Sequence, residues 1–204
     1  RDGDALVLGA STVSGNLSVQ AGGDITQSGN VVVNTAGTTA NFHAAGFNVN
    51  VGTQAGNDFN TVVATGADVT IRDANALILG AVTATGNLTV TTAGAITQTG
   101  TITNNGATSV ATFNAGVGNN ITLNAPANNF TTAVVQAGKD VTLQDVGALV
   151  LGASTVSGNL SVQAGGDITQ SGNVVVNTAG TTANFQAAGF NVNVGTQAGN
   201  DFNT

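Results

Sequence analysis

The sequence predicts an all-β chain that folds as a parallel β-solenoid, with about three coils in each 71-residue repeat. Three features predict this fold: tandem repetition, alternation of apolar and polar residues in short segments, and a composition poor in helix formers. The 204 residues include ten Asp but no Glu, one Lys, two Arg and no Met, against 29 Gly and 26 Asn. Because Glu, Lys, Met and Arg favour helices, while Val and Thr suit strands and Gly and Asn suit turns, an α-rich or α/β domain is disfavoured.

The repetition is visible when the sequence is aligned with itself. Residues 5–61 recur at 148–204 with one change in 57 positions, His43 becoming Gln186. A diverged copy lies between them, at an offset of 71 residues. We therefore expect one continuous solenoid over 1–204, part of a longer array, with units at about 1–71, 72–143 and, incomplete, 144–204.

Each unit divides into three segments of about 20 to 30 residues, and each segment contains short alternating strands. At 16–19, 48–51 and 68–71 every second residue is apolar, so one face of each strand is buried. Stretches of turn formers, such as 21–23 and 54–58, separate the strands. An antiparallel sandwich or barrel is the competing all-β fold, but it requires no fixed sequence period, whereas stacked coils about 4.8 Å apart do.

The interior of the rod is expected to consist of stacked aliphatic residues of the Leu6, Val69 and Leu77 type, with Asn and Thr ladders outside or at turns. The chain has no Cys, so packing and backbone pairing must hold the fold without disulfides. Eight full coils and one partial coil are expected. Six Phe residues are predicted to fill the corners of the longest coil: Phe42, Phe59, Phe113, Phe130, Phe185 and Phe202.

Three strings, at residues 5–19, 21–29 and 55–59, resemble the repeats of very large bacterial surface proteins of the filamentous haemagglutinin type. The resemblance covers essentially the whole chain. It implies a long right-handed parallel β-helical shaft that is exported by two-partner secretion and displayed outside the bacterial cell. In such proteins the shaft serves adhesion or surface coating.

Charge and hydropathy exclude several partners. With three basic residues and a formal charge of −7, the chain has no surface for nucleic acid or for anionic membranes. No apolar run is long enough to span a bilayer, so membrane insertion is not expected. The first four residues do not match the pattern of a signal peptide. If the chain is exported, its leader is expected to lie outside this segment, and a chain without a leader would be cytosolic.

No catalytic, cofactor-binding or metal-binding residue is predicted. Asp is the only acid, and a calcium-binding solenoid would need the Gly-Gly-x-Gly-x-Asp nonapeptide, which the sequence lacks. Gly56, Asn57 and Asp58 form only a fragment of it, and turns capped by Asx hydrogen bonds are the favoured interpretation. The same interpretation covers nine Asp residues beside Gly, Asn, Ala or a strand start: Asp4, Asp24, Asp58, Asp68, Asp73, Asp140, Asp145, Asp167 and Asp201.

The sequence also argues against an enzyme. The single imidazole, His43, is replaced by Gln186 and Asn114 in the other copies, so we interpret it as an exposed polar position. Polysaccharide lyases and hydrolases built on β-helices need a carboxylate pair or a basic group in a cleft, and usually aromatic platforms. The chain has no Trp or Tyr, and its three basic residues are scattered: Arg1, Arg72 and Lys139.

Five triplets match the N-glycosylation pattern, and several of their Asn residues lie at strand starts, where they are expected to join stacked ladders: Asn16, Asn87, Asn120, Asn129 and Asn159. Two functions from different classes remain. The first is a structural shaft of a surface adhesin or filament. The second is a module that binds ice or a polysaccharide through flat Thr and Asn ladders, such as Thr89 and Thr91. The equivalent positions Ser18 and Gln20 break that ladder, which favours the shaft.

The expected partners are neighbouring repeats of the same protein, end to end or side by side, and a host or surface ligand that the sequence does not identify. The ends of the segment carry no capping helix, so exposed strand edges are expected to continue into further repeats or to stack on other copies.

Overall fold

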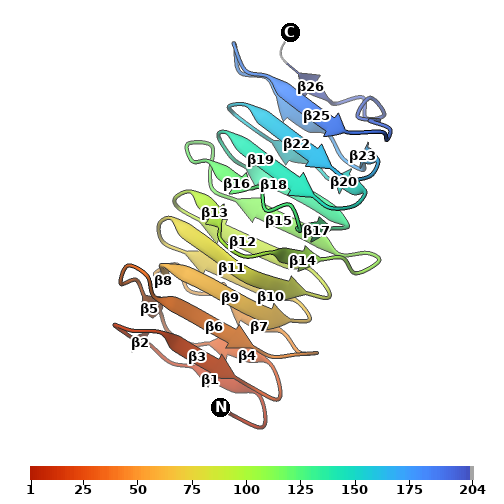
Figure 1. Cartoon of the computed structure of the whole chain (residues 1–204). Helices are drawn as coiled ribbons and strands as arrows, with labels where there is room; N and C mark the ends of the chain where they lie inside the picture. The colour runs from red at the N-terminus through yellow and green to blue at the C-terminus, as the bar shows by residue number, and fades with distance from the viewer. Residues whose placement is uncertain (203–204) are drawn as a thin grey trace.

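The computed structural model, which describes residues 1–202, is one rod of stacked turns with the two chain ends at opposite ends of the rod (Figure 1). Its strands pair only in parallel, and residues 1–202 contain no helix. The chain advances along the rod without doubling back, because each strand pairs with the equivalent strands one turn below and one turn above. The predicted all-β parallel solenoid of about nine turns is confirmed.

Two long sheets form opposite faces of the rod, because every turn contributes one strand to each. Sheet I has nine strands: β1 (Leu6–Leu8), β4 (Ile25–Gln27), β7 (Val49–Val51), β10 (Val69–Asp73), β12 (Leu88–Thr92), β15 (Val110–Asn114), β18 (Thr132–Ala137), β20 (Leu149–Leu151) and β23 (Ile168–Gln170). Sheet II stacks nine more: β3 (Leu17–Gln20), β6 (Thr39–His43), β9 (Thr61–Gly66), β11 (Leu77–Ala84), β13 (Ile96–Gln98), β16 (Ile121–Leu123), β19 (Val141–Asp145), β22 (Leu160–Ala164) and β25 (Ala183–Ala187).

Short strands add a third side to some turns. We call each set of three such stacked segments a brace. The braces are β2 (Ser11–Thr12), β5 (Val31–Val33) and β8 (Asp58–Phe59); the end of β11 with β14 (Ile102–Asn104) and β17 (Asn129–Phe130); and β21 (Ser154–Thr155), β24 (Val174–Val176) and β26 (Asp201–Phe202).

The sequence repeat and the structural turn do not coincide. From β1 to β20 the chain makes seven steps in sheet I, and these two strands are equivalent positions 143 residues apart. One unit of about 71 residues therefore makes three and a half turns, where the sequence predicted about three. As a result Leu6 lies in sheet I, its copy Leu77 lies in sheet II, and the next copy Leu149 returns to sheet I.

The half turn places successive braces on opposite edges of the rod. The first brace lies on the edge we call the β5 edge, and the second on the opposite β14 edge (Figure 1). Opposite the first brace, tight turns on the β14 edge join sheet II directly to sheet I. Opposite the second brace, tight turns on the β5 edge join sheet I directly to sheet II. Each edge therefore alternates between a brace and a run of tight turns, with a period of seven turns.

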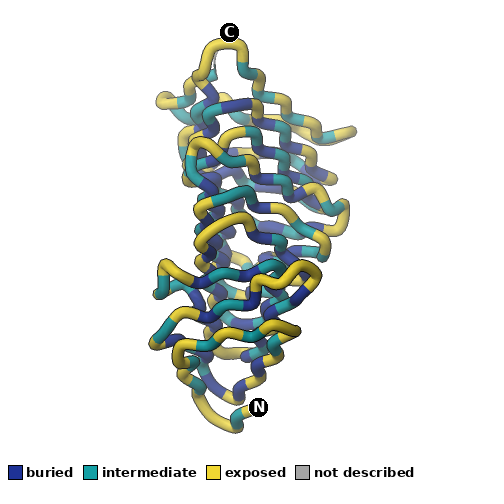
Figure 2. Tube along the Cα trace, turned by 90° about the vertical axis from the view of Figure 1, so that its left-hand side faces the viewer, coloured by how far each residue is buried: buried dark blue, intermediate teal, exposed yellow. Residues whose placement is uncertain are grey.

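Between the two end turns, residues alternate between buried and more exposed along most strands (Figure 2). The buried residues form one continuous hydrophobic core between the sheets. Val69 and Leu77 are fully buried there, as predicted. The six Phe residues form three edge-to-face pairs, with ring centroids 5.9 to 6.0 Å apart, where a brace meets a long sheet: Phe42 with Phe59, Phe113 with Phe130, and Phe185 with Phe202. Such pairs fill a corner of the core, as the sequence predicted.

Candidate functional site

Two buried carboxylates end the first and second braces. Asp73 Oδ1 accepts the backbone N–H of Phe59 at 2.6 Å, and its Oδ2 accepts that of Asn75 at 2.9 Å. Asp145 binds the N–H groups of Phe130 and Gly147 in the same way, at 2.6 and 2.7 Å. Phe59 and Phe130 belong to β8 and β17, the last strands of their braces, so each carboxylate covers an N–H group that would otherwise stay open at a sheet edge.

Burial sets the protonation of these groups. Asp73 and Asp145 are each 3% exposed. Loss of solvation raises the pKa of Asp73 to about 6, against the lowering effect of its two backbone hydrogen bonds. Burial also raises the pKa of Asp145. A raised pKa can mark a catalytic acid, but both oxygens of each group are engaged by backbone N–H groups, so these carboxylates act as structural caps.

The fragment that suggested calcium binding is part of a buried amide clamp. Asn57 is fully buried, and its side chain exchanges two hydrogen bonds with the amide of Gln27, at 2.8 and 2.9 Å. Asn57 also accepts the N–H of Val31 and donates to the carbonyl of Val51. The clamp recurs with the same partners in the other units, as Gln98 with Asn128 and Gln170 with Asn200. Asn57 is thus occupied in joining a brace to sheet I.

Asp and Asn side chains form ladders at the tight turns. On the β14 edge each side-chain oxygen accepts the N–H of the next Asx residue up the rod: Asp24 from Asn48, Asn48 from Asp68, and Asp68 from Asn87. Asn120, Asp140 and Asn159 repeat this on the β5 edge. Asp and Asn alternate in both ladders, so stacked carboxylates are separated by two turns. Four Asn residues of the N-glycosylation triplets also accept a backbone N–H from the next turn: Asn16 from Thr39, Asn87 from Val110, Asn120 from Asp140 and Asn159 from Thr182.

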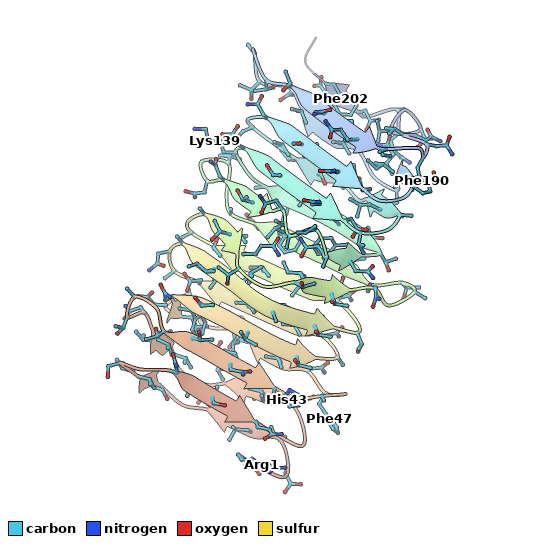
Figure 3. All side chains as sticks on the ribbon, in the orientation of Figure 1. Arg1, His43, Phe47, Lys139, Phe190 and Phe202 are labelled. Atoms are coloured by element: carbon cyan, nitrogen blue, oxygen red, sulfur yellow. The ribbon has the colours of Figure 1, made fainter. Side chains whose placement is uncertain are left out.

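The remaining predicted positions do not converge. Asp58 accepts hydrogen bonds from the side-chain amides of Asn34 and Asn75. His43 is half-buried on the outer face of sheet II between Gln20 and Thr65. Arg1 lies at the N-terminal end of the rod and Lys139 on the β5 edge (Figure 3). Residues 1–202 contain no group of three or more His or Asp side chains close enough to hold a metal ion, and no helix long and apolar enough to cross a membrane.

Thr ladders exist on the outer faces, but each is one residue wide for most of its length. In sheet I, Thr70, Thr89 and Thr112 pair in successive turns. The neighbouring column holds Thr91 between Arg72 and Asn114, so only one turn of this stack presents the Thr-x-Thr pattern. A second stack, Thr122 paired with Thr142, lies on sheet II.

A shallow groove opens on the surface beside the third brace. It has a volume of about 590 Å³ and lies where the outer face of sheet I meets the third brace. Hydroxyl and amide groups share its lining with two Val side chains: Thr112, Val134, Gln136, Ala153, Ser154, Thr155, Asn173 and Val175. Sequence reasoning missed this groove, because residues from strands far apart in the chain line it, namely β15, β18, β21 and β24. It also missed the amide clamp, although Gln and Asn spaced 30 residues apart recur in all three units.

The comparisons with known proteins agree with the repeat architecture. No curated protein and no solved structure matches the chain significantly. A family described as repeats of unknown function (DUF5649) matches three times in succession, at residues 1–66, 66–137 and 138–204. The matches begin within about six residues of the units expected from the sequence and confirm the tandem repetition. Since they cover the chain from end to end, this protein belongs to the DUF5649 family of repeats of unknown function.

Proposed function

We propose that this chain is a shaft segment of an extracellular fibrous protein at a bacterial cell surface, supporting attachment or the formation of a sheath or filament. The observation that supports this most is the unbroken core, in which nine strands of sheet I stack without a gap. The buried polar groups Asn57, Asp73 and Asp145 are used inside the fold. The resemblance to repeats of the filamentous haemagglutinin type supports the same role, including export and surface display.

A solenoid suits this role because its length scales with the number of repeats. Each turn contacts only the turns below and above it, so added units lengthen the rod without changing its cross-section. Seven turns add about 34 Å at about 4.8 Å per turn. A protein with many such units would hold a terminal domain far from the cell envelope, and no chemistry on the shaft is needed for that purpose.

The proposal is tested in cells that make the complete protein. Antibodies raised against residues 1–202 should label intact cells, and a tag at the distal end should move about 34 Å closer to the envelope for every 143 residues deleted. Attachment should fall as the shaft shortens, while binding of the isolated distal region in solution stays constant. Antigen found only inside cells, or attachment that is independent of shaft length, would contradict the proposal.

The alternative function is recognition of ice or a polysaccharide by the Thr stacks. The observation that favours it is the column of Thr70, Thr89 and Thr112 at the spacing of the turns. If these hydroxyl groups bind a regular surface, replacing all three by Val should abolish partition of the rod into ice or onto an insoluble polysaccharide. Absence of partition by the unchanged rod would eliminate this alternative and leave the shaft.

A further inference from the structure

One Asn-Gly dipeptide occurs in the chain, in the loop that follows β14 in the second brace. Its Asn105 comes directly after the strand and is exposed to solvent. The equivalent residues of the first and third units, Asn34 and Asn177, are each followed by Thr. A Gly after Asn leaves the next backbone nitrogen open to the Asn side chain, because Gly has no Cβ, whereas the branched side chain of Thr obstructs the approach. The loop after β14 therefore differs in chemistry from its two copies.

The side chain of Asn105 also lacks the anchor that its copies have. In the first unit Asn34 Nδ2 donates to Asp58 Oδ2 at 2.6 Å, and the third unit repeats this contact at 3.0 Å. The register places Asn129 in β17 where Asp58 stands in β8. Within residues 1–202, the side chains of Asn105 and Asn129 make no hydrogen bond. An amide in place of the acid has thus released the Asn105 side chain.

The backbone nitrogen that would react with this side chain is accessible as well. The N–H of Gly106 has no hydrogen-bond partner in the described part of the chain. Its carbonyl oxygen, by contrast, accepts from the N–H of Ser109 at 3.0 Å, from the Ser109 hydroxyl at 2.9 Å and from the Thr131 hydroxyl at 2.8 Å. A Cβ at Gly106 would overlap the carbonyl oxygen of Thr85, so stacking on the turn below requires glycine here. The fold therefore keeps an unbonded N–H next to a free side-chain amide.

We propose that Asn105 deamidates spontaneously in the folded rod, because its side chain is unanchored and Gly106 follows it. The Gly106 nitrogen loses its proton to hydroxide and attacks Asn105 Cγ. The bond from Cγ to Nδ2 breaks, and Nδ2 takes a proton from water and leaves as ammonia. Water then opens the succinimide at Cγ to give aspartate, or at the Asn105 carbonyl carbon to give isoaspartate. This inference goes beyond the shaft proposal and does not depend on it, since the reaction needs only water and the local structure.

The two products have different consequences for the second brace. A carboxylate at position 105 is an acceptor for the free amide of Asn129, which repeats the contact of Asn34 with Asp58 with the roles exchanged. Isoaspartate instead adds a methylene group to the backbone just after β14. Either product adds one negative charge to the formal charge of −7, so anion exchange separates deamidated chains from unchanged ones. The rate should rise with pH, because hydroxide removes the Gly106 proton.

The first test incubates the unchanged chain at pH 8 and at pH 5, with circular dichroism showing that it stays folded. Peptide mapping with electron-transfer fragmentation locates the modified residue and separates isoaspartate from aspartate. Conversion is expected at Asn105, faster at pH 8, while the internal controls Asn34 and Asn177 stay unconverted over the same time. Hydroxylamine, which cleaves succinimides, should cut the chain between Asn105 and Gly106. No conversion at Asn105, or equal conversion at all three Asn residues, would overturn the proposal.

The second test separates the missing anchor from the Asn-Gly sequence itself. Asn129→Asp places a carboxylate where Asp58 and Asp201 stand in the other units, so the fold accepts it. The reaction at Asn105 should then be about tenfold slower, because a hydrogen bond to a carboxylate must break before the amide turns. Asn129→Ala, which offers no acceptor, is the matched control and should deamidate as fast as the unchanged chain. Equal rates in the two variants would overturn the assignment of the reaction to an unanchored side chain.

Discussion

Asn104 shows how a single diverged residue can weaken an otherwise repeated core. It is fully buried in β14 and donates to the carbonyls of Ala84 and Gly86, but its Oδ1 is the one buried side-chain polar atom without a partner in residues 1–202. The equivalent residues in the other braces are Val33 and Val176, both buried. A buried, unpaired acceptor retains the cost of losing water, which is about 1 to 3 kcal/mol.

We therefore expect Asn104→Val to raise the free energy of unfolding by about 1 kcal/mol, since the unpaired oxygen disappears and the loss of two hydrogen bonds offsets part of the gain. Urea denaturation followed by circular dichroism measures this change. The reverse substitution, Val33→Asn, is the matched control and should destabilise the rod, because it buries an amide in an apolar site. Destabilisation by Asn104→Val would show that the hydrogen bonds to Ala84 and Gly86 outweigh the unpaired oxygen.

Asp73 gives the stability of the rod a dependence on pH. Because burial raises its pKa from 3.8 to about 6, the folded chain binds the proton more tightly than the unfolded chain does. Its contribution to stability is therefore fully present below pH 4 and is lost as the pH rises through 6. In Asp73→Asn the amide oxygen can still accept the Phe59 N–H, so stability should fall less between pH 4 and pH 7 than in the unchanged chain.

Urea midpoints at several pH values measure that difference. Asp145→Asn should act in the same direction, because burial raises the pKa of Asp145 as well. The urea midpoint of the double variant should change less with pH than that of either single variant. Identical pH profiles for Asp73→Asn and the unchanged chain would show that this carboxyl does not titrate differently in the folded and unfolded states.

At the level of the elements, the amide clamp determines how a brace attaches to sheet I. Asn57→Ala would leave the Val31 N–H and the Gln27 Oε1 without partners in a buried place, whereas the Gln27 Nε2 would keep its hydrogen bond to the carbonyl of Gly29. We expect a loss of about 3 kcal/mol, and a double variant with Gln27→Ala that costs less than the sum of the two single changes. Asn200, half-buried in the last turn, provides a matched site where Asn200→Ala should cost less. Strict additivity of the first pair would contradict a coupled clamp.

The strands were the easiest elements to predict, because alternation of apolar residues directly reflects burial of one face. The braces were harder, since strands of two or three residues such as β2 and β8 leave almost no periodic signal. The caps on Phe59 and Phe130 could not be predicted either, because Asp73 and Asp145 are the last residues of strands in other turns and meet the braces only through stacking. Sequence patterns record neighbours along the chain, and these contacts are made across turns.

The whole rod has a symmetry that the sequence period hides. Sheets I and II both accept the pattern of Leu6 to Leu8 and of Leu77 to Leu79, so the sequence does not reveal that successive units begin on opposite faces. A unit of three and a half turns relates its copies by a half rotation combined with a translation along the axis. Each surface feature therefore appears alternately on both sides of the rod.

Deleting one unit should move every later feature to the other side of the rod. Removal of residues 77–148 joins Ala76 to Leu149, a junction equivalent to Ala76–Leu77, so the shortened chain should still unfold cooperatively in urea.

The position of the later features is measured with spin labels. The chain has no Cys, so labels on Phe47→Cys and Phe190→Cys report one distance. In the unchanged rod the labels should lie about 34 Å apart along one edge, at about 4.8 Å for each of seven turns. In the shortened rod the two labels should lie on opposite edges, separated by about 17 Å along the axis plus the width of the rod. If a unit made three whole turns instead, both labels would lie on one edge, about 14 Å apart.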